Sequence, residues 1–128
     1  MINFDFTDKR ILVVGGSRGI GKGVVENLIL LGAEVLYAAR NPFLEEKNAK
    51  FIEVDLNYES QIIDMFSEID KGGGIDAVVN TAAINYCKKF DEISTDEWDK
   101  VERINLRAAF ILCKHASIRM KGQKYGKI

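Results

Sequence analysis

Short runs of apolar residues alternate along the chain with segments in which apolar residues recur at every third or fourth position. The runs cover residues 11–14, 35–39, 51–54 and 77–79. Continuous apolar runs of this length are typical of strands that are buried on both faces of a parallel sheet. The pattern therefore predicts four such strands, and residues 125–128 read as the opening of a fifth.

The segments between the runs have the period of helices. Apolar residues recur from position 20 to 31 and the repeat stops at Gly32, as at a helix C-terminus. Similar patterns span residues 62–69, for which Asn57 is a suitable N-cap, and residues 108–120. Strand and helix alternate with short connections, which predicts an α/β fold with a doubly wound parallel sheet and right-handed crossovers.

A further helix is expected to begin after Ser94. Ser94 and Glu97 form the S-x-x-E pattern of a capping box, in which the two residues bond to each other's backbone. Trp98, Val101 and Asn105 follow at spacings that place them on one face of this helix. We therefore expect Asn105 to point inward.

Composition limits the kinds of partner. The 128 residues suit one domain, residues 1–128, and 18 basic and 19 acidic side chains leave a net charge of -1. This balance favours neither nucleic acid nor a membrane as partner, and no apolar stretch approaches the roughly 20 residues of a membrane span. Cys87, Cys113 and His115 form no ligand pattern, so no metal site is expected. The start of the chain lacks the order of a signal peptide, which favours a cytoplasmic location.

A glycine-rich loop spans Gly15 to Gly21 and joins the first strand to the first helix. Glycines there permit a tight turn, the close approach of a ligand and the packing of helix against strand. The free N–H groups at the start of the helix would face an anion such as a diphosphate. The alternative is a tight turn that binds nothing.

The same loop overlaps a second phosphate-binding pattern. Residues 16–22 match G-x-x-x-x-G-K, but Gly23 stands where a P-loop has a serine or threonine hydroxyl that binds magnesium. Glycine cannot supply that ligand. A P-loop nucleotide-binding protein is therefore kept only as an alternative.

The motifs, in this order, resemble the short-chain dehydrogenase/reductase family. Residues 14–21 match its T-G-x-x-x-G-x-G loop with Val14 in place of the threonine, and Asp55-Leu56 resembles the D-[VL] pair beside the adenine ring. The likeness implies a Rossmann-type fold. It covers the whole chain but only the N-terminal half of a typical member, so the chain would be truncated near the start of the fifth strand.

Two further segments extend the resemblance. Residues 80–83 read N-T-A-A and resemble the family's N-N-A-G, so Asn80 and Ala82 carry over whereas the other two residues depart from the pattern. Asn105, within the sequence I-N-L, resembles the active-site asparagine of the family. Four motifs at compatible spacing are far more specific than any one of them.

The resemblance implies a nicotinamide dinucleotide as cofactor. NADP(H) is favoured over NAD(H), because Arg40 follows the second strand, where NAD-binding proteins have an acid. Arg18 in the glycine loop can approach the same 2'-phosphate, which guanidinium groups bind through paired hydrogen bonds. The expected cofactor-binding residues are Gly15, Ser17, Arg18, Gly19, Ile20, Gly21, Arg40, Asp55, Leu56, Asn80 and Ala82.

The Tyr-x-x-x-Lys pair that transfers the proton in this family is absent, because none of the four tyrosines has a lysine four residues later. Asn105 is the one catalytic residue that the resemblance carries over. The leading hypothesis is the NADP(H)-binding portion of an oxidoreductase for carbonyl or alcohol substrates, inactive by itself. A non-catalytic dinucleotide-binding module is the alternative.

An incomplete fifth strand would leave the edge of the fourth strand unpaired and the helix at 108–120 without a neighbour. Apolar surface would then be exposed. We therefore expect the chain to self-associate or to pair with a complementary C-terminal polypeptide.

Overall fold

The computed structural model describes residues 3–43 and 48–128. In this part of the chain the strands form one parallel sheet with the order β3-β2-β1-β4. The strands are β1 (Arg10–Val14), β2 (Glu34–Ala39), β3 (Ala49–Glu53) and β4 (Ala77–Asn80). All four predicted strands are confirmed, with ends that differ by one or two residues. The order places β1 at the centre, so the loop after β1 opens between the segments that follow β2 and β4.

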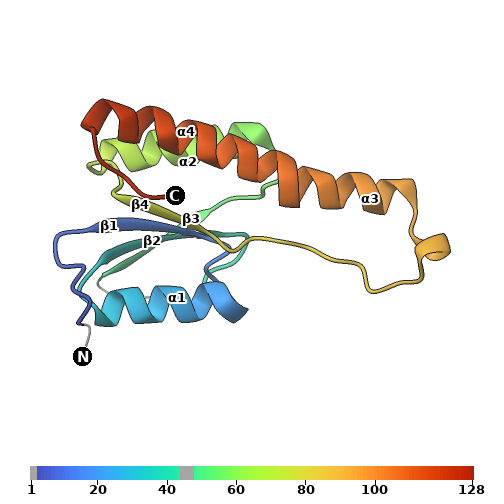
Figure 1. Cartoon of the computed structure of the whole chain (residues 1–128), viewed down its shortest axis with the longest axis horizontal. Helices are drawn as coiled ribbons and strands as arrows, with labels where there is room; N and C mark the ends of the chain where they lie inside the picture. Colours follow the sequence, from blue (N-terminus) through green and yellow to red (C-terminus); the bar gives the residue numbers. More distant parts are fainter. Residues whose placement is uncertain (1–2, 44–47) are drawn as a thin grey trace.

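Helices cover both faces of the sheet (Figure 1). One face carries α1 (Gly19–Leu30), and the other carries α2 (Glu59–Lys71) and α4 (Ala108–Gln123). A short 3-10 turn, η1 (Phe90–Glu92), precedes α3 (Thr95–Glu102), which continues through a π-helical segment, η2 (Arg103–Arg107), into α4. The doubly wound Rossmann-type arrangement is confirmed.

Alternate side chains of the central strand pack on opposite faces. Leu12 and Val14 belong to the apolar cluster under α2 and α4, whereas Ile11 and Val13 belong to the cluster against α1. All four are at most 3% exposed. Because both faces are covered, every position from Ile11 to Val14 is apolar, which explains the continuous run in the sequence.

The capping box predicted at Ser94 is confirmed. The side chain of Ser94 accepts from the N–H of Glu97, and the Glu97 carboxylate accepts from the N–H of Ser94. Lys88 also donates to Glu97, and this bond is the main reason that the pKa of Glu97 is lowered. The helical rod from α3 to α4 therefore starts at a well-defined point beyond the sheet (Figure 1).

A single β-bridge at Lys127 marks the expected opening of a fifth strand. Lys127 forms a parallel bridge with Ala77. The N–H of Lys127 donates to the carbonyl of Asp76 (3.1 Å), and the carbonyl of Lys127 accepts from the N–H of Val78 (2.9 Å).

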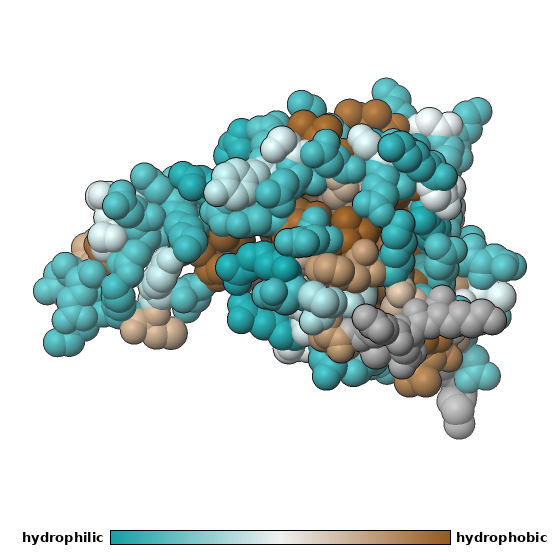
Figure 2. Space-filling view, turned by 180° about the vertical axis from the view of Figure 1, so that it is seen from behind, coloured by the Kyte–Doolittle hydropathy of each residue, from teal (hydrophilic) through white to brown (hydrophobic). Residues whose placement is uncertain are grey.

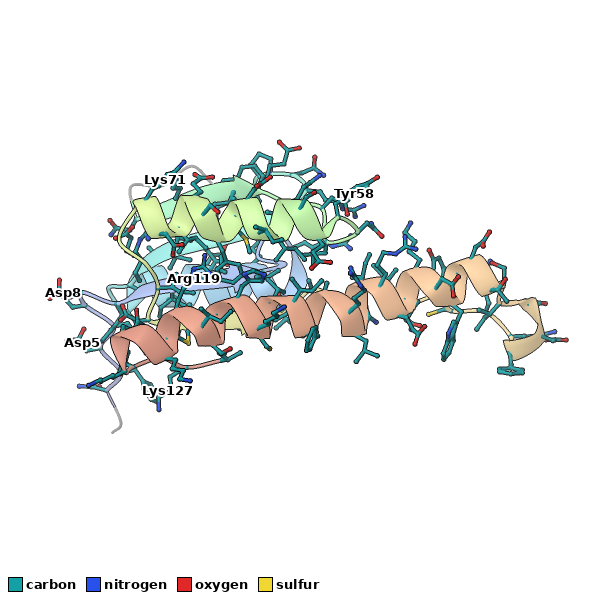
Figure 3. The ribbon with its side chains drawn as sticks, turned by 90° about the horizontal axis from the view of Figure 1, so that it is seen from above. Asp5, Asp8, Tyr58, Lys71, Arg119 and Lys127 are labelled. Carbon is teal, nitrogen blue, oxygen red and sulfur yellow. The ribbon has the colours of Figure 1, made fainter. Side chains whose placement is uncertain are left out.

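Seen from above, α4 runs beside α2 (Figure 3), and Arg119 of α4 binds Asp70 of α2 through two hydrogen bonds of 2.7 Å. No helix in the described ranges is long and apolar enough to span a membrane.

Candidate functional site

A cleft of about 600 Å³ lies at the carboxyl ends of the strands. Parallel strands end at the same edge, so the glycine loop after β1 meets the segments after β2, β3 and β4 there. The predicted cofactor-binding residues that line it are Gly15, Ser17, Arg18, Gly19, Ile20, Gly21, Arg40, Asp55, Leu56 and Ala82. Asn80 does not line the cleft, and its side chain instead accepts from the N–H of Ala82 at 3.1 Å.

Close packing requires glycine at Gly15 and at Gly21 of the loop. Gly15 has φ +82°, and a Cβ there would lie 2.8 Å from the backbone nitrogen of Ala82. A Cβ on Gly21 would collide with the carbonyl oxygen of Gly15 and the hydroxyl of Thr81. Gly19 differs, because its φ is +54° and a Cβ would meet nothing within 4 Å. The loop is thus tightly packed at Gly15 and Gly21 and open at Gly19, which lines the cleft.

Thr81 holds the end of β4 to the end of β1. Its N–H and its hydroxyl both donate to the carbonyl of Val14 at 2.9 Å, and the hydroxyl also lies 3.3 Å from the carbonyl of Gly15. The sequence had indicated Thr81 only as a departure from a family pattern. No local signal reveals these bonds, because their partners are more than sixty residues away in the chain.

Two arginines stand on the rim of the cleft. Arg18 and Arg40 both line it, and both are exposed. Neither guanidinium has an ion-pair partner among residues 3–43 and 48–128. No carboxylate of the described residues forms an ion pair with either guanidinium, and guanidinium groups suit the binding of anions.

Asp55 is held by the segment that follows it. Its Oδ1 accepts from the N–H of Asn57 (2.9 Å) and from the side-chain amide of Asn57 (2.8 Å), while its own N–H donates to Gln61 Oε1 at 2.8 Å. The prediction that Asn57 caps the helix is wrong. The N-cap of α2 is Tyr58, without a side-chain hydrogen bond, because the amide of Asn57 is turned to Asp55 instead.

Asn105 lies in the π-helical segment and binds both backbone polar groups of one residue, Ile84, in the loop after β4. Its Oδ1 accepts from Ile84 N–H at 2.9 Å and its Nδ2 donates to Ile84 O at 2.8 Å. The expectation that Asn105 points into the core is wrong, since the residue is exposed and Trp98 on the preceding turns is 59% exposed. The reason is tertiary, because α3 extends past the edge of the sheet and meets no core there (Figure 1).

Several lining residues were missed by sequence reasoning. They are Asn41, Asn57, Thr81, Ala83, Ile84, Asn85, Tyr86, Lys100 and Ile104, together with Val14, Ala38, Ala39 and Val54 of the strands and their ends. Asn41 and Asn57 follow strand ends, a position that signals the same edge of the sheet. Lys100 and Ile104 reach the cleft only because the helical rod from α3 to α4 passes above it.

Within the described residues, no group of His, Cys, Asp or Glu is placed to hold a metal ion.

Comparison with known proteins places this geometry in a family. The sequence model of the short chain dehydrogenases matches residues 9–128. The 3-oxoacyl-[acyl-carrier-protein] reductase FabG of Aquifex aeolicus is 31% identical over 91% of this chain and 52% of its own length. The NADP-dependent (R)-specific alcohol dehydrogenase of Lentilactobacillus kefiri is 29% identical over 92% of this chain and 51% of its own.

A solved structure shows the same fold. The short chain dehydrogenase from Leptospira borgpetersenii with bound NAD+ has a TM-score of 0.87 and 24% identity, over 93% of this chain and 48% of that one. This chain spans about half the length of the relatives that it matches. The family match over residues 9–128 and the glycine loop of the parallel sheet lead to one conclusion: the chain belongs to the short-chain dehydrogenase family.

Proposed function

We propose that this chain is the NADP(H)-binding portion of an oxidoreductase that acts on carbonyl or alcohol groups. The observation that carries the proposal is the cleft itself, which gathers the glycine loop, Asp55 and two arginines without ion-pair partners in the described chain. Family membership supports the reaction class and argues against the P-loop alternative. When bound, the nicotinamide would donate or accept a hydride.

The residues present fit a dinucleotide. The open space above Gly19 and the start of α1 suit a diphosphate, because N–H groups at a helix N-terminus favour an anion. Asp55 and Leu56, after β3, suit the adenine, and Ala82 lies against the turn at Gly15. These groups would bind and orient the cofactor.

The choice of NADP(H) over NAD(H) rests on Arg18 and Arg40. A 2'-phosphate is the part of NADP(H) that NAD(H) lacks, and guanidinium groups bind phosphate with charge-assisted hydrogen bonds. The relatives do not decide the choice, since one is named as NADP-dependent and a structural neighbour holds NAD+. The two rim arginines of this chain favour the phosphorylated form.

We propose Asn105 as the active-site residue that this chain contributes. Its two bonds to Ile84 fix the loop that forms one wall of the cleft. The same bonds occupy both ends of its side-chain amide, so its contribution is to hold that wall. Substrate chemistry would need a Tyr-x-x-x-Lys pair, a pattern that these 128 residues do not contain.

Fluorescence titration with NADPH tests the proposal. We expect saturable binding that is tighter than for NADH and that does not depend on magnesium. Failure to bind NADPH, or tight binding of magnesium-ATP instead, would overturn it. A panel of ketones with NADPH then distinguishes an enzyme from a binding module, because turnover by this chain alone would contradict its being only the cofactor-binding portion.

Association with another polypeptide, either a second copy or a complementary C-terminal one, is the second part of the proposal. Leu106 and Phe110 on the rod are 66% and 65% exposed, and the outer edge of β4 is bridged by Lys127 alone in the described chain. Figure 2 shows apolar patches on the projecting segment and where it joins the body. Sedimentation of the purified chain as a monomer of 14.4 kDa would count against self-association.

A further inference from the structure

We propose that Asn57 is a positioning residue that makes the cleft select adenine over a 6-oxopurine base. The inference rests on the proposed dinucleotide-binding function and adds to it a reason for base selectivity. It starts from the bonds around Asp55, in the segment between β3 and α2. Tyr58, at the N-terminal end of α2, marks this segment in Figure 3.

One carboxylate oxygen of Asp55 is fully engaged and the other is not. Oδ1 accepts both donors of Asn57, its backbone N–H and its side-chain amide, at 2.9 and 2.8 Å. Oδ2 accepts no hydrogen bond from residues 3–43 and 48–128. Asp55 and Asn57 both line the cleft, so the carboxylate presents a fixed, acceptor-only oxygen beside the space for a ligand.

The backbone of Asp55 is fixed as firmly as its side chain. Its N–H donates to Gln61 Oε1 at 2.8 Å, and its carbonyl accepts from the N–H of Tyr58 at 3.1 Å. With its backbone held, Asp55 can move mainly by rotation of its side-chain carboxylate. The side-chain amide of Asn57 opposes that rotation through its bond to Oδ1. An asparagine suited to cap α2 thus serves the cleft wall, because Tyr58 takes the N-cap position without a side-chain bond.

This arrangement discriminates between purines by their substituent at carbon 6. Adenine carries an amino group there, which can donate to Oδ2 of Asp55. A 6-oxopurine carries a carbonyl, and two acceptors that face each other repel. Selectivity depends on holding the carboxylate in place, since a carboxylate free to turn can move its oxygens away from the carbonyl.

The test compares NADPH with reduced nicotinamide hypoxanthine dinucleotide phosphate, which has a carbonyl in place of the adenine amino group and therefore a hydrogen on the neighbouring ring nitrogen N1. Nicotinamide fluorescence reports the binding of both. We expect the wild type to prefer NADPH by roughly tenfold, as one hydrogen bond to a charged group implies. Asn57→Ala should lose most of this preference, because the freed carboxylate can turn away from the carbonyl and the hypoxanthine dinucleotide then binds more tightly.

Three other variants sharpen the test. Asn57→Leu removes the donor but keeps side-chain volume, and should lose the preference as well. Asn57→Ser restores a hydroxyl donor and should recover part of it. Asn41→Ala removes an asparagine from the same cleft but has no bond to Asp55, so the ratio of the two affinities should stay at the wild-type value. Circular dichroism of each variant checks that it is folded.

The outcomes separate the two proposals. If the wild type binds both dinucleotides equally, or if folded Asn57→Ala and Asn57→Leu keep the wild-type ratio, the role of Asn57 is wrong while dinucleotide binding stands. If the wild type binds neither, the proposed function itself is overturned.

Discussion

The hydroxyl of Thr81 donates a hydrogen bond to the carbonyl oxygen of Val14 over 2.9 Å and so joins the end of β4 to the end of β1. The glycine loop begins at the next residue, Gly15. We predict that Thr81→Val lowers the free energy of unfolding by about 1 kcal/mol and weakens NADPH binding, because the loop loses this support. Urea denaturation and NADPH titration measure the two effects. Thr81→Ser keeps the hydroxyl and should bind NADPH more tightly than Thr81→Val.

Gly21 is predicted to tolerate no side chain. A Cβ there would meet the carbonyl oxygen of Gly15 and the hydroxyl of Thr81, so Gly21→Ala should destabilise the fold by about 1–3 kcal/mol and abolish tight NADPH binding. Gly23→Ala is the matched control in the same helix. A Cβ on Gly23 meets nothing within 4 Å, and alanine favours a helix over glycine by up to about 1 kcal/mol. Equal effects of the two variants in thermal denaturation would contradict the packing argument.

The two rim arginines should determine cofactor choice. We predict that Arg40→Ala and Arg18→Ala each weaken NADPH binding by roughly tenfold and leave NADH binding nearly unchanged, because only NADPH carries the phosphate. Arg103→Ala is the control, since Arg103 is exposed and does not line the cleft. A parallel loss of both cofactors in Arg40→Ala would show that Arg40 acts on the fold or on the diphosphate instead.

The pair of Asp70 and Arg119 should make stability depend on pH. Hydrogen bonds from Arg119 lower the pKa of Asp70, so the folded state binds the proton less readily than the unfolded chain. This stabilisation is present above the unfolded pKa of about 3.9 and is lost as pH falls through the lower pKa of the folded state. Half-exposed pairs contribute little, so Asp70→Asn should cost roughly 0.5 kcal/mol at neutral pH.

Denaturation at several pH values checks this prediction. The difference between wild type and Asp70→Asn should shrink below about pH 4, as the wild-type carboxylate becomes protonated. Asp64→Asn, on the same helix but without an ion pair in the described chain, is the control. A difference for Asp70→Asn that is constant down to pH 2 would contradict the role of the ionised pair.

Family and fold were accessible from local signals. Apolar runs and helical periods depend on neighbours in the sequence, and they predicted β1 to β4, the boundaries of α1 and the capping box at Ser94 within a few residues. The glycine loop carried its signal in the spacing of its glycines. These features are visible in the sequence because the forces that produce them act within a few residues.

The tertiary structure alone decided how the strand ends meet and what the polar side chains near them do. Asn57 suited a helix cap by its position but binds Asp55, and Asn105 suited a buried face but holds Ile84 at the surface. Thr81 bonds to residues more than sixty positions away. A polar side chain takes the partner that the fold brings within hydrogen-bond distance, and the sheet order and the path of the helical rod determine that partner only after the chain has folded.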